Sequence, residues 1–116
     1  MIHQLDWKHL HGRHFVPQAV VGKAPADIEN THNVKFSRGE DDLYYFEGAL
    51  LRLDDKVDFI LKRYDRNEEE GQTTIYLPYE ISNIQDIAEI IGSIARELGI
   101  SRTELLWERS ASDRKR

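Results

Sequence analysis

The sequence predicts an α+β domain in which an antiparallel sheet of three to five strands packs against one long amphipathic helix, followed by a short C-terminal helix. Three observations lead to this prediction. Segments rich in branched and aromatic residues alternate with polar turns over 42–77. A stretch with helical periodicity follows at 83–98. A second helix-start signal then opens 102–109, which we expect to be the short helix.

Length and composition indicate a single domain over 1–109. The chain has 116 residues, of which 40% are hydrophobic and 32% charged, enough for one core and a well-solvated surface. Cysteine is absent, which excludes disulfides and thiol chemistry. The N-terminus lacks the apolar segment of a signal peptide, and no run is long enough to span a bilayer. We therefore expect a soluble cytoplasmic domain, with a flexible tail at 110–116.

Charge is distributed unevenly along the chain. The net charge is −5, and residues 40–70 alone hold eleven acidic against five basic side chains. The two ends, 1–39 and 101–116, are each slightly basic. Nucleic acids attract cationic surfaces that release their counterions, so the acidic middle disfavours them as partners while the basic ends leave some room for them. We expect no membrane partner.

Residues 1–39 are the least regular part of the sequence. All five histidines lie there, and prolines and glycines interrupt its apolar runs. Residues 15–16 and 19–21 have the composition of a short strand or a covering arm. Residues 26–29 follow a proline, as a helical turn often does. We expect an ordered but irregular arm laid over the sheet.

Residues 42–77 predict a meander of three antiparallel strands. Gly48 interrupts the first strand and indicates a bulge. A tight polar connection at 54–56 joins the first two strands, and a charged turn at 65–71 joins the second to the third. The expected strands are 43–53, 57–64 and 72–77.

The helix predicted at 83–98 has one apolar face. Its apolar residues recur at intervals of three and four: Ile84, Ile87, Ile91, Ile94 and Leu98. The spacing of Ser82 and Gln85 is that of a capping box, and Gly99 marks the end of the helix. We expect the apolar face to cover one side of the sheet, the side that holds Phe59, Leu61, Ile75 and Leu77.

The opposite side of the sheet has an apolar patch that needs an explanation. A patch of this size on a soluble protein indicates a covering segment or a partner. Either residues 13–36 cover it, or it binds another protein or a second copy of the chain. The candidate partner-binding residues are Tyr44, Ile60, Tyr64 and Tyr76, with Tyr45 as the alternative to Tyr44.

Residues 91–109 resemble the helix-turn-helix of DNA-binding proteins. Ala95, Gly99, Ile100 and Leu105 match the small, turn and apolar positions of that motif, and 101–104 has the spacing of a capping box. The resemblance implies that Arg102, Thr103 and Trp107 lie on the helix that enters the major groove. The structural alternative is a helix that ends at glycine, followed by a short helix or strand that closes the core.

Three histidines are the best candidates for a metal site. Two histidines at i and i+2 on a strand share a face, and a third nearby could complete a tetrahedral zinc site with Asp6. The candidate ligands are His9, His11 and His14. The alternative is a set of solvated histidines in a flexible arm.

No catalytic motif stands out in the sequence. The serines lack a nucleophile-elbow context, and no glycine-rich phosphate loop is present. The favoured function is therefore a non-enzymatic protein-interaction module or homodimer, without a cofactor, that uses the tyrosine-bearing face. A DNA-binding regulator is the first alternative, and a histidine-based metal-binding protein or enzyme is the second.

Overall fold

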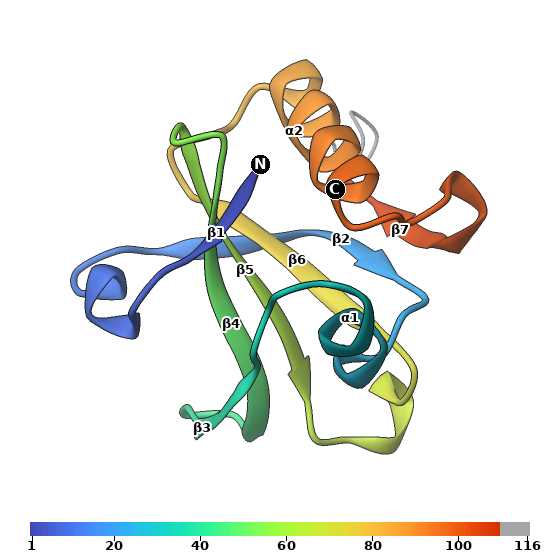
Figure 1. Ribbon diagram of the computed structural model, residues 1–116. Helices are drawn as coiled ribbons and strands as arrows, with labels where there is room; N and C mark the ends of the chain where they lie inside the picture. Colours follow the sequence, from blue (N-terminus) through green and yellow to red (C-terminus); the bar gives the residue numbers. More distant parts are fainter. Residues whose placement is uncertain (110–116) are drawn as a thin grey trace.

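The computed structural model describes residues 1–109, and within this range seven strands form one antiparallel sheet. The strand order is β1–β4–β5–β6–β2–β7, and β3 pairs with the half of β4 that β1 leaves open (Figure 1). The strands are β1 (Ile2–Gln4), β2 (Phe15–Val21), β3 (Ser37–Glu40), β4 (Tyr45–Leu53), β5 (Val57–Tyr64), β6 (Thr73–Pro78) and β7 (Leu105–Glu108).

Two α-helices and three 3₁₀ turns complete the described chain. They are α1 (Pro25–Thr31), α2 (Ile84–Glu97), η1 (Trp7–Leu10), η2 (Asn67–Glu69) and η3 (Arg102–Glu104). Both α-helices lie on the same face of the sheet (Figure 1). The α+β prediction is confirmed, but the expected three to five strands are too few. No helix in the described range is long and apolar enough to cross a membrane.

The predicted meander is confirmed as β4, β5 and β6, which pair in order. The tight turn after β4 holds Asp54 and Asp55 at φ of 52° and 58°, a left-handed conformation that aspartate tolerates better than most residues. The bulge expected at Gly48 is absent, because the register of β4 with β5 continues through it without a shift. A Cβ at Gly48 would lie 3.3 Å from the ring of Trp7, so the glycine gives η1 room to approach the sheet.

The prediction that residues 1–39 form an irregular arm over the sheet is wrong, because this segment supplies three strands to the sheet itself. β2 lies between β6 and β7, with Ala19 and Val21 fully buried. Pro17 has no amide hydrogen to donate, and the register of β2 shifts between Pro17 and Ala19. The irregular sequence thus reflects a bulged strand inside the sheet.

The expected short helix at 102–109 is also wrong. A single turn, η3, is followed by β7, which adds to the edge of β2. The backbone amides of Gly22 and Arg109 donate to the carbonyls of Glu104 and Gln18 at 2.6 and 2.9 Å, respectively. These hydrogen bonds to β2 favour a strand over a helix at 105–108, because the edge of β2 offers a row of backbone groups that would otherwise be unpaired.

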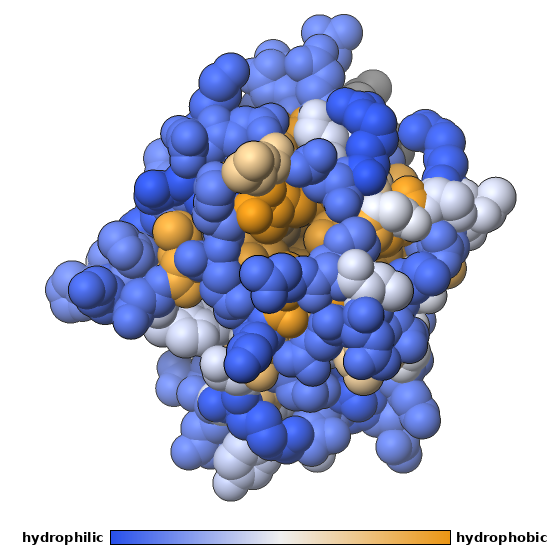
Figure 2. Space-filling model, viewed as in Figure 1, coloured by the Kyte–Doolittle hydropathy of each residue, from blue (hydrophilic) through white to orange (hydrophobic). Residues whose placement is uncertain are grey.

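The helix predicted at 83–98 is confirmed as α2, and its apolar face packs as expected. Ile87, Ile91 and Ile94 are buried in one cluster with the predicted sheet residues Phe59, Leu61, Ile75 and Leu77. The N-cap is Asn83 rather than Ser82, since its side chain accepts hydrogen bonds from the amides of Gln85 and Asp86. On this helix-bearing face, apolar residues are visible in a hollow between α1 and α2 (Figure 2).

Candidate functional site

The tyrosine-bearing face of the sheet holds a lysine ammonium among three aromatic rings. Nζ of Lys62 lies 4.8 Å from the ring centroid of each of Phe46, Tyr64 and Tyr76. The three strands β4, β5 and β6 bring these side chains together, because Phe46 pairs with Tyr64 and Gly48 with Lys62. An ammonium in this position is attracted by the negative faces of the rings.

Asp41, in the turn before β4, completes this cluster. Its Oδ2 accepts a hydrogen bond of 2.7 Å from the Tyr64 hydroxyl and lies 3.5 Å from Nζ of Lys62. Burial alone would raise the pKa of Asp41, but the Tyr64 hydrogen bond, two backbone amides and Lys62 lower it to about 2. Burial, with Glu69 and Asp41 nearby, raises the pKa of Tyr76 to about 12. Asp41 is therefore ionised and Tyr76 neutral over the whole physiological range.

The four predicted partner-binding residues do not form one exposed surface. Ile60 is only 6% exposed, and Tyr64 and Tyr76 are half-buried around Lys62. Tyr44 is 48% exposed, in the turn between β3 and β4. The side chain of Lys62, which the sequence places on the same strand face, thus covers much of the expected apolar patch.

A second charged cluster on this face was not anticipated from the sequence. Asp58, only 7% exposed, accepts hydrogen bonds from Arg52 at 2.6 and 3.3 Å and from Arg13 at 2.5 Å. Burial would raise the pKa of Asp58, but the hydrogen bonds from Arg52 and Arg13 hold it below its ordinary value. The alternation of β5 places Asp58 on this face, but only the strand register shows that Arg52 lies opposite.

The three histidines predicted as metal ligands are not assembled into a site. His9 lies in η1, and His11 and His14 lie in the exposed segment between η1 and β2. The ring of His14 contacts that of Tyr79, with centroids 5.7 Å apart. Across residues 1–109, no three His, Asp or Glu side chains lie together in a way that could hold a metal ion.

The residues implied by the helix-turn-helix resemblance lie on no common helix. Arg102 and Thr103 belong to η3, whereas Trp107 is in the middle of β7. A helix-turn-helix reads the major groove with its second helix. Since β7 takes the place of that helix, DNA binding through these three residues stays a prediction from the sequence alone.

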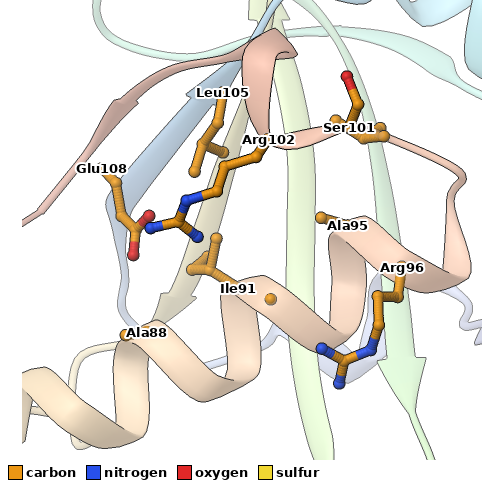
Figure 3. A pocket seen from close by; sticks show the side chains of 10 residues that line it. Ala88, Ile91, Ala95, Arg96, Ser101, Arg102, Leu105 and Glu108 are labelled. Atoms are coloured by element: carbon orange, nitrogen blue, oxygen red, sulfur yellow. The ribbon is translucent and has the colours of Figure 1, made fainter.

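A groove between α2 and β7 forms an apolar depression at the edge of the sheet (Figure 3). It has a volume of about 250 Å³. Ala88, Ile91 and Ala95 of α2 form one wall, and Leu105 faces them from β7. Arg102 and Glu108 extend toward each other at the mouth of the groove (Figure 3), although no ion pair joins them within the described chain.

The strand β7 itself is an edge strand with large apolar side chains. In the sheet formed by residues 1–109 it pairs with β2 alone. Leu106 is 54% and Trp107 37% exposed. The sequence contained a weak signal for this site, since Trp107 has high strand propensity, but the capping box before it favoured a helix.

Comparisons of the chain with protein-family models, with curated proteins and with solved structures find no match.

Proposed function

We propose that this protein is a non-enzymatic interaction module that binds an extended protein segment by strand addition at β7, next to the groove between α2 and β7. One observation supports this proposal best. Within residues 1–109, β7 pairs with a strand on one side only, and it carries two exposed apolar side chains, Leu106 and Trp107. The interaction role expected from the sequence is kept. The binding surface that we propose is β7 rather than the tyrosine-bearing face, because Lys62 already covers the rings of the tyrosine-bearing face.

The backbone of β7 supplies the affinity in this proposal. Alternate residues of an antiparallel strand direct their amide and carbonyl groups to opposite sides, so β2 satisfies only one side of β7. An incoming extended segment can hydrogen-bond to the other side, as in known strand-addition complexes. Such a strand edge on a soluble protein is otherwise a liability for unspecific pairing.

The side chains of β7 and the groove supply selectivity. Burying the remaining exposed surface of Leu106 and Trp107 against a partner would contribute roughly 1 kcal/mol each from apolar area alone. Tryptophan is also enriched among the residues that dominate binding energy at interfaces. The small side chains of Ala88, Gly92 and Ala95 leave the groove open to a side chain of the incoming segment.

Site-specific photo-crosslinking tests the proposal. A benzophenone amino acid would replace Leu106 in one sample and Leu43, an exposed residue of the turn between β3 and β4, in a matched control. After irradiation in the native cell extract, we expect a discrete protein adduct from position 106 that is absent or much weaker from position 43. Equal labelling from the two positions, or none from either, would contradict the proposal.

A further inference from the structure

We infer that a small cavity beside the bulge of β2 binds a short-chain aliphatic carboxylate, whose oxygens accept hydrogen bonds from Gln18 and Arg109. This inference does not depend on the function proposed above. The cavity has a volume of about 220 Å³. Strand β2, the segment between β6 and α2, and the residue after β7 form its walls, with the lining residues Val16, Gln18, Tyr79, Ile81, Ser82 and Arg109.

The side-chain amide of Gln18 is the observation that points to a ligand. Gln18 is the extra residue of the bulge and is only 2% exposed. Its Oε1 accepts a hydrogen bond of 2.6 Å from Nε of Arg109, which fixes the amide group with Nε2 turned the other way. Nε2 has no acceptor within residues 1–109, and no buried side-chain nitrogen or oxygen in this range lacks a partner. Nε2 is therefore reached through the cavity, where it can donate to a bound molecule.

Arg109 supplies a positive charge next to this amide. Besides the bond to Gln18, its Nη2 donates to the carbonyl of Pro17 at 3.0 Å, and the guanidinium lies 5.7 Å from the ring centroid of Trp107. These contacts hold the side chain in place, and they leave Nη1 without a partner in the described part of the chain. A guanidinium held in this way loses little conformational freedom when it binds an anion.

The lining of the cavity contains hydrogen-bond donors but no acid. Ser82 adds a hydroxyl that α2 does not use, because Asn83 caps the helix instead. Tyr79 adds a second hydroxyl, and none of the six lining residues is acidic. The larger cavity beside the buried Asp58 differs, since three basic and three acidic residues line it and its formal charges cancel. The cavity at Gln18 therefore favours an anion.

The apolar residues Val16 and Ile81 favour an aliphatic carboxylate over an inorganic anion. Phosphate has oxygens on all sides, so it would place some of them against these apolar side chains without hydrogen bonds. A hydrocarbon tail can pack there while the carboxylate faces the donors of Gln18 and Arg109. The tail must be short, because the cavity is smaller than the roughly 300 Å³ at which typical ligand pockets begin.

A titration followed by nuclear magnetic resonance tests the site. Butyrate is added to the isotope-labelled whole chain, and the side-chain signals of Gln18 Nε2 and Arg109 Nε are followed. We expect both signals to shift and to saturate with a Kd on the order of 1 mM, as is usual for so small a ligand. Absence of a saturable shift at butyrate concentrations up to about 20 mM would overturn the inference.

Two control ligands separate the parts of the proposed chemistry. Butyramide keeps the tail but lacks the charge, and inorganic phosphate keeps the charge but lacks the tail. Each should bind at least fivefold more weakly than butyrate. Butyramide binding as tightly as butyrate would show that the cavity does not select an anion, and equally tight phosphate binding would show that the apolar wall has no role. Either result would overturn the assignment of an aliphatic carboxylate.

Gln18→Glu is the most specific variant for this site. It keeps the size of the side chain and the acceptor for Arg109, but a carboxylate oxygen replaces the amide donor and repels the ligand. Butyrate binding should weaken at least tenfold. Arg38→Gln is the matched control, because Arg38 is an exposed residue of β3, which pairs with β4 and not with β2. A folded Gln18→Glu variant that binds butyrate as tightly as the wild type would contradict the inference.

Arg109→Met provides the second variant if Gln18→Glu does not fold. It keeps much of the apolar stem at a partly exposed position but removes the guanidinium. We expect butyrate to bind at least fivefold more weakly, because the ligand loses its positively charged partner. Thermal melting checks that each variant is folded. Wild-type affinity in folded Arg109→Met would exclude the guanidinium from the site and overturn the inference.

Discussion

On the face of the sheet that carries α1 and α2, apolar side chains such as Phe59, Leu61 and Ile75 are fully buried beneath the helices. On the opposite face, Leu50 and Ile60 are also buried, but η1 is the covering element that contacts β4. The remaining cover comes from long charged side chains, which pair with a buried aspartate or lie across aromatic rings. The comparison shows that a sheet without a second helical layer can close one face with arginine and lysine stems.

The largest effect is expected on the helix-bearing face. Phe59→Ala should lower the free energy of unfolding by about 4 kcal/mol, because it removes a fully buried ring and leaves a cavity. Urea denaturation measures the change. Tyr79→Ala, at an exposed position, is the matched control and should cost under about 0.5 kcal/mol. Similar losses in the two variants would mean that this face is not the principal core.

The next effect belongs to the buried aspartate of the opposite face. Asp58→Ala should cost about 3 kcal/mol, since it leaves Arg13 and Arg52 without their shared carboxylate. Arg38→Ala, which breaks an exposed ion pair with Asp65, is the comparison variant and should cost about 0.5 kcal/mol or less. An Asp58→Ala cost no larger than that of Arg38→Ala would show that the arginine pair does not stabilise this face.

Acid should distinguish the cluster around Lys62 from the apolar core. The pKa of Asp41 falls from 3.8 to about 2 on folding, so its contribution to stability is complete above pH 3.8 and disappears as pH falls through about 2. The stability difference between wild type and Asp41→Asn should therefore be constant above about pH 4 and vanish near pH 2. Urea titrations at several pH values measure this difference. A difference that persists unchanged at pH 2 would contradict the assigned charge state of Asp41.

A smaller effect is expected from the lysine itself. Lys62→Met keeps most of the stem but removes the ammonium from the three rings, and should cost about 1 kcal/mol. Lys56→Met, in the turn between β4 and β5, is the matched control and should be neutral within about 0.5 kcal/mol. An unchanged stability of Lys62→Met would indicate that the rings pack equally well without the charge.

The smallest effect on stability should come from the β7 edge. Leu106→Lys changes an exposed side chain and should alter the unfolding free energy by less than about 0.5 kcal/mol at low concentration. Thermal melts at about 2 µM measure this. A large loss there would mean that Leu106 supports the fold, and its use as a probe of binding would then need a milder substitution such as Leu106→Ser.

Local patterns predicted the regular parts of this fold. The recurrence of Ile87, Ile91 and Ile94 is contained within one helix, and the meander needs only neighbouring strands. The positions of β2 and β7 depend instead on partners far away in the chain, so Pro17 and the capping box at 101–104 gave misleading local signals. Pairing with strands far away in the sequence determined the structure of both segments.

For the candidate sites, too, local patterns predicted one part and long-range contacts determined the rest. The alternation of β5 correctly grouped Ile60 and Tyr64 on one face, but the reach of Lys62 over three rings depends on the registers of β4 and β6. The helix-start signal at 101–104 predicted a helix over residues that include Leu106 and Trp107, which lie in a strand. The sequence therefore predicted which side chains share a face more reliably than which of them remain accessible.

The position of β2 between β6 and β7 has a consequence for synthesis of the protein. β2 is made early, but its neighbours β6 and β7 come much later in the chain. At about 5–20 residues per second, the nascent β2 waits several seconds for β6, with the apolar Ala19 and Val21 unpaired. A ribosome that stalls before β6 would leave this strand free to pair with other nascent chains. Slow translation of the segment between β2 and β6 should therefore increase aggregation, and a chaperone that binds extended apolar segments should counteract it.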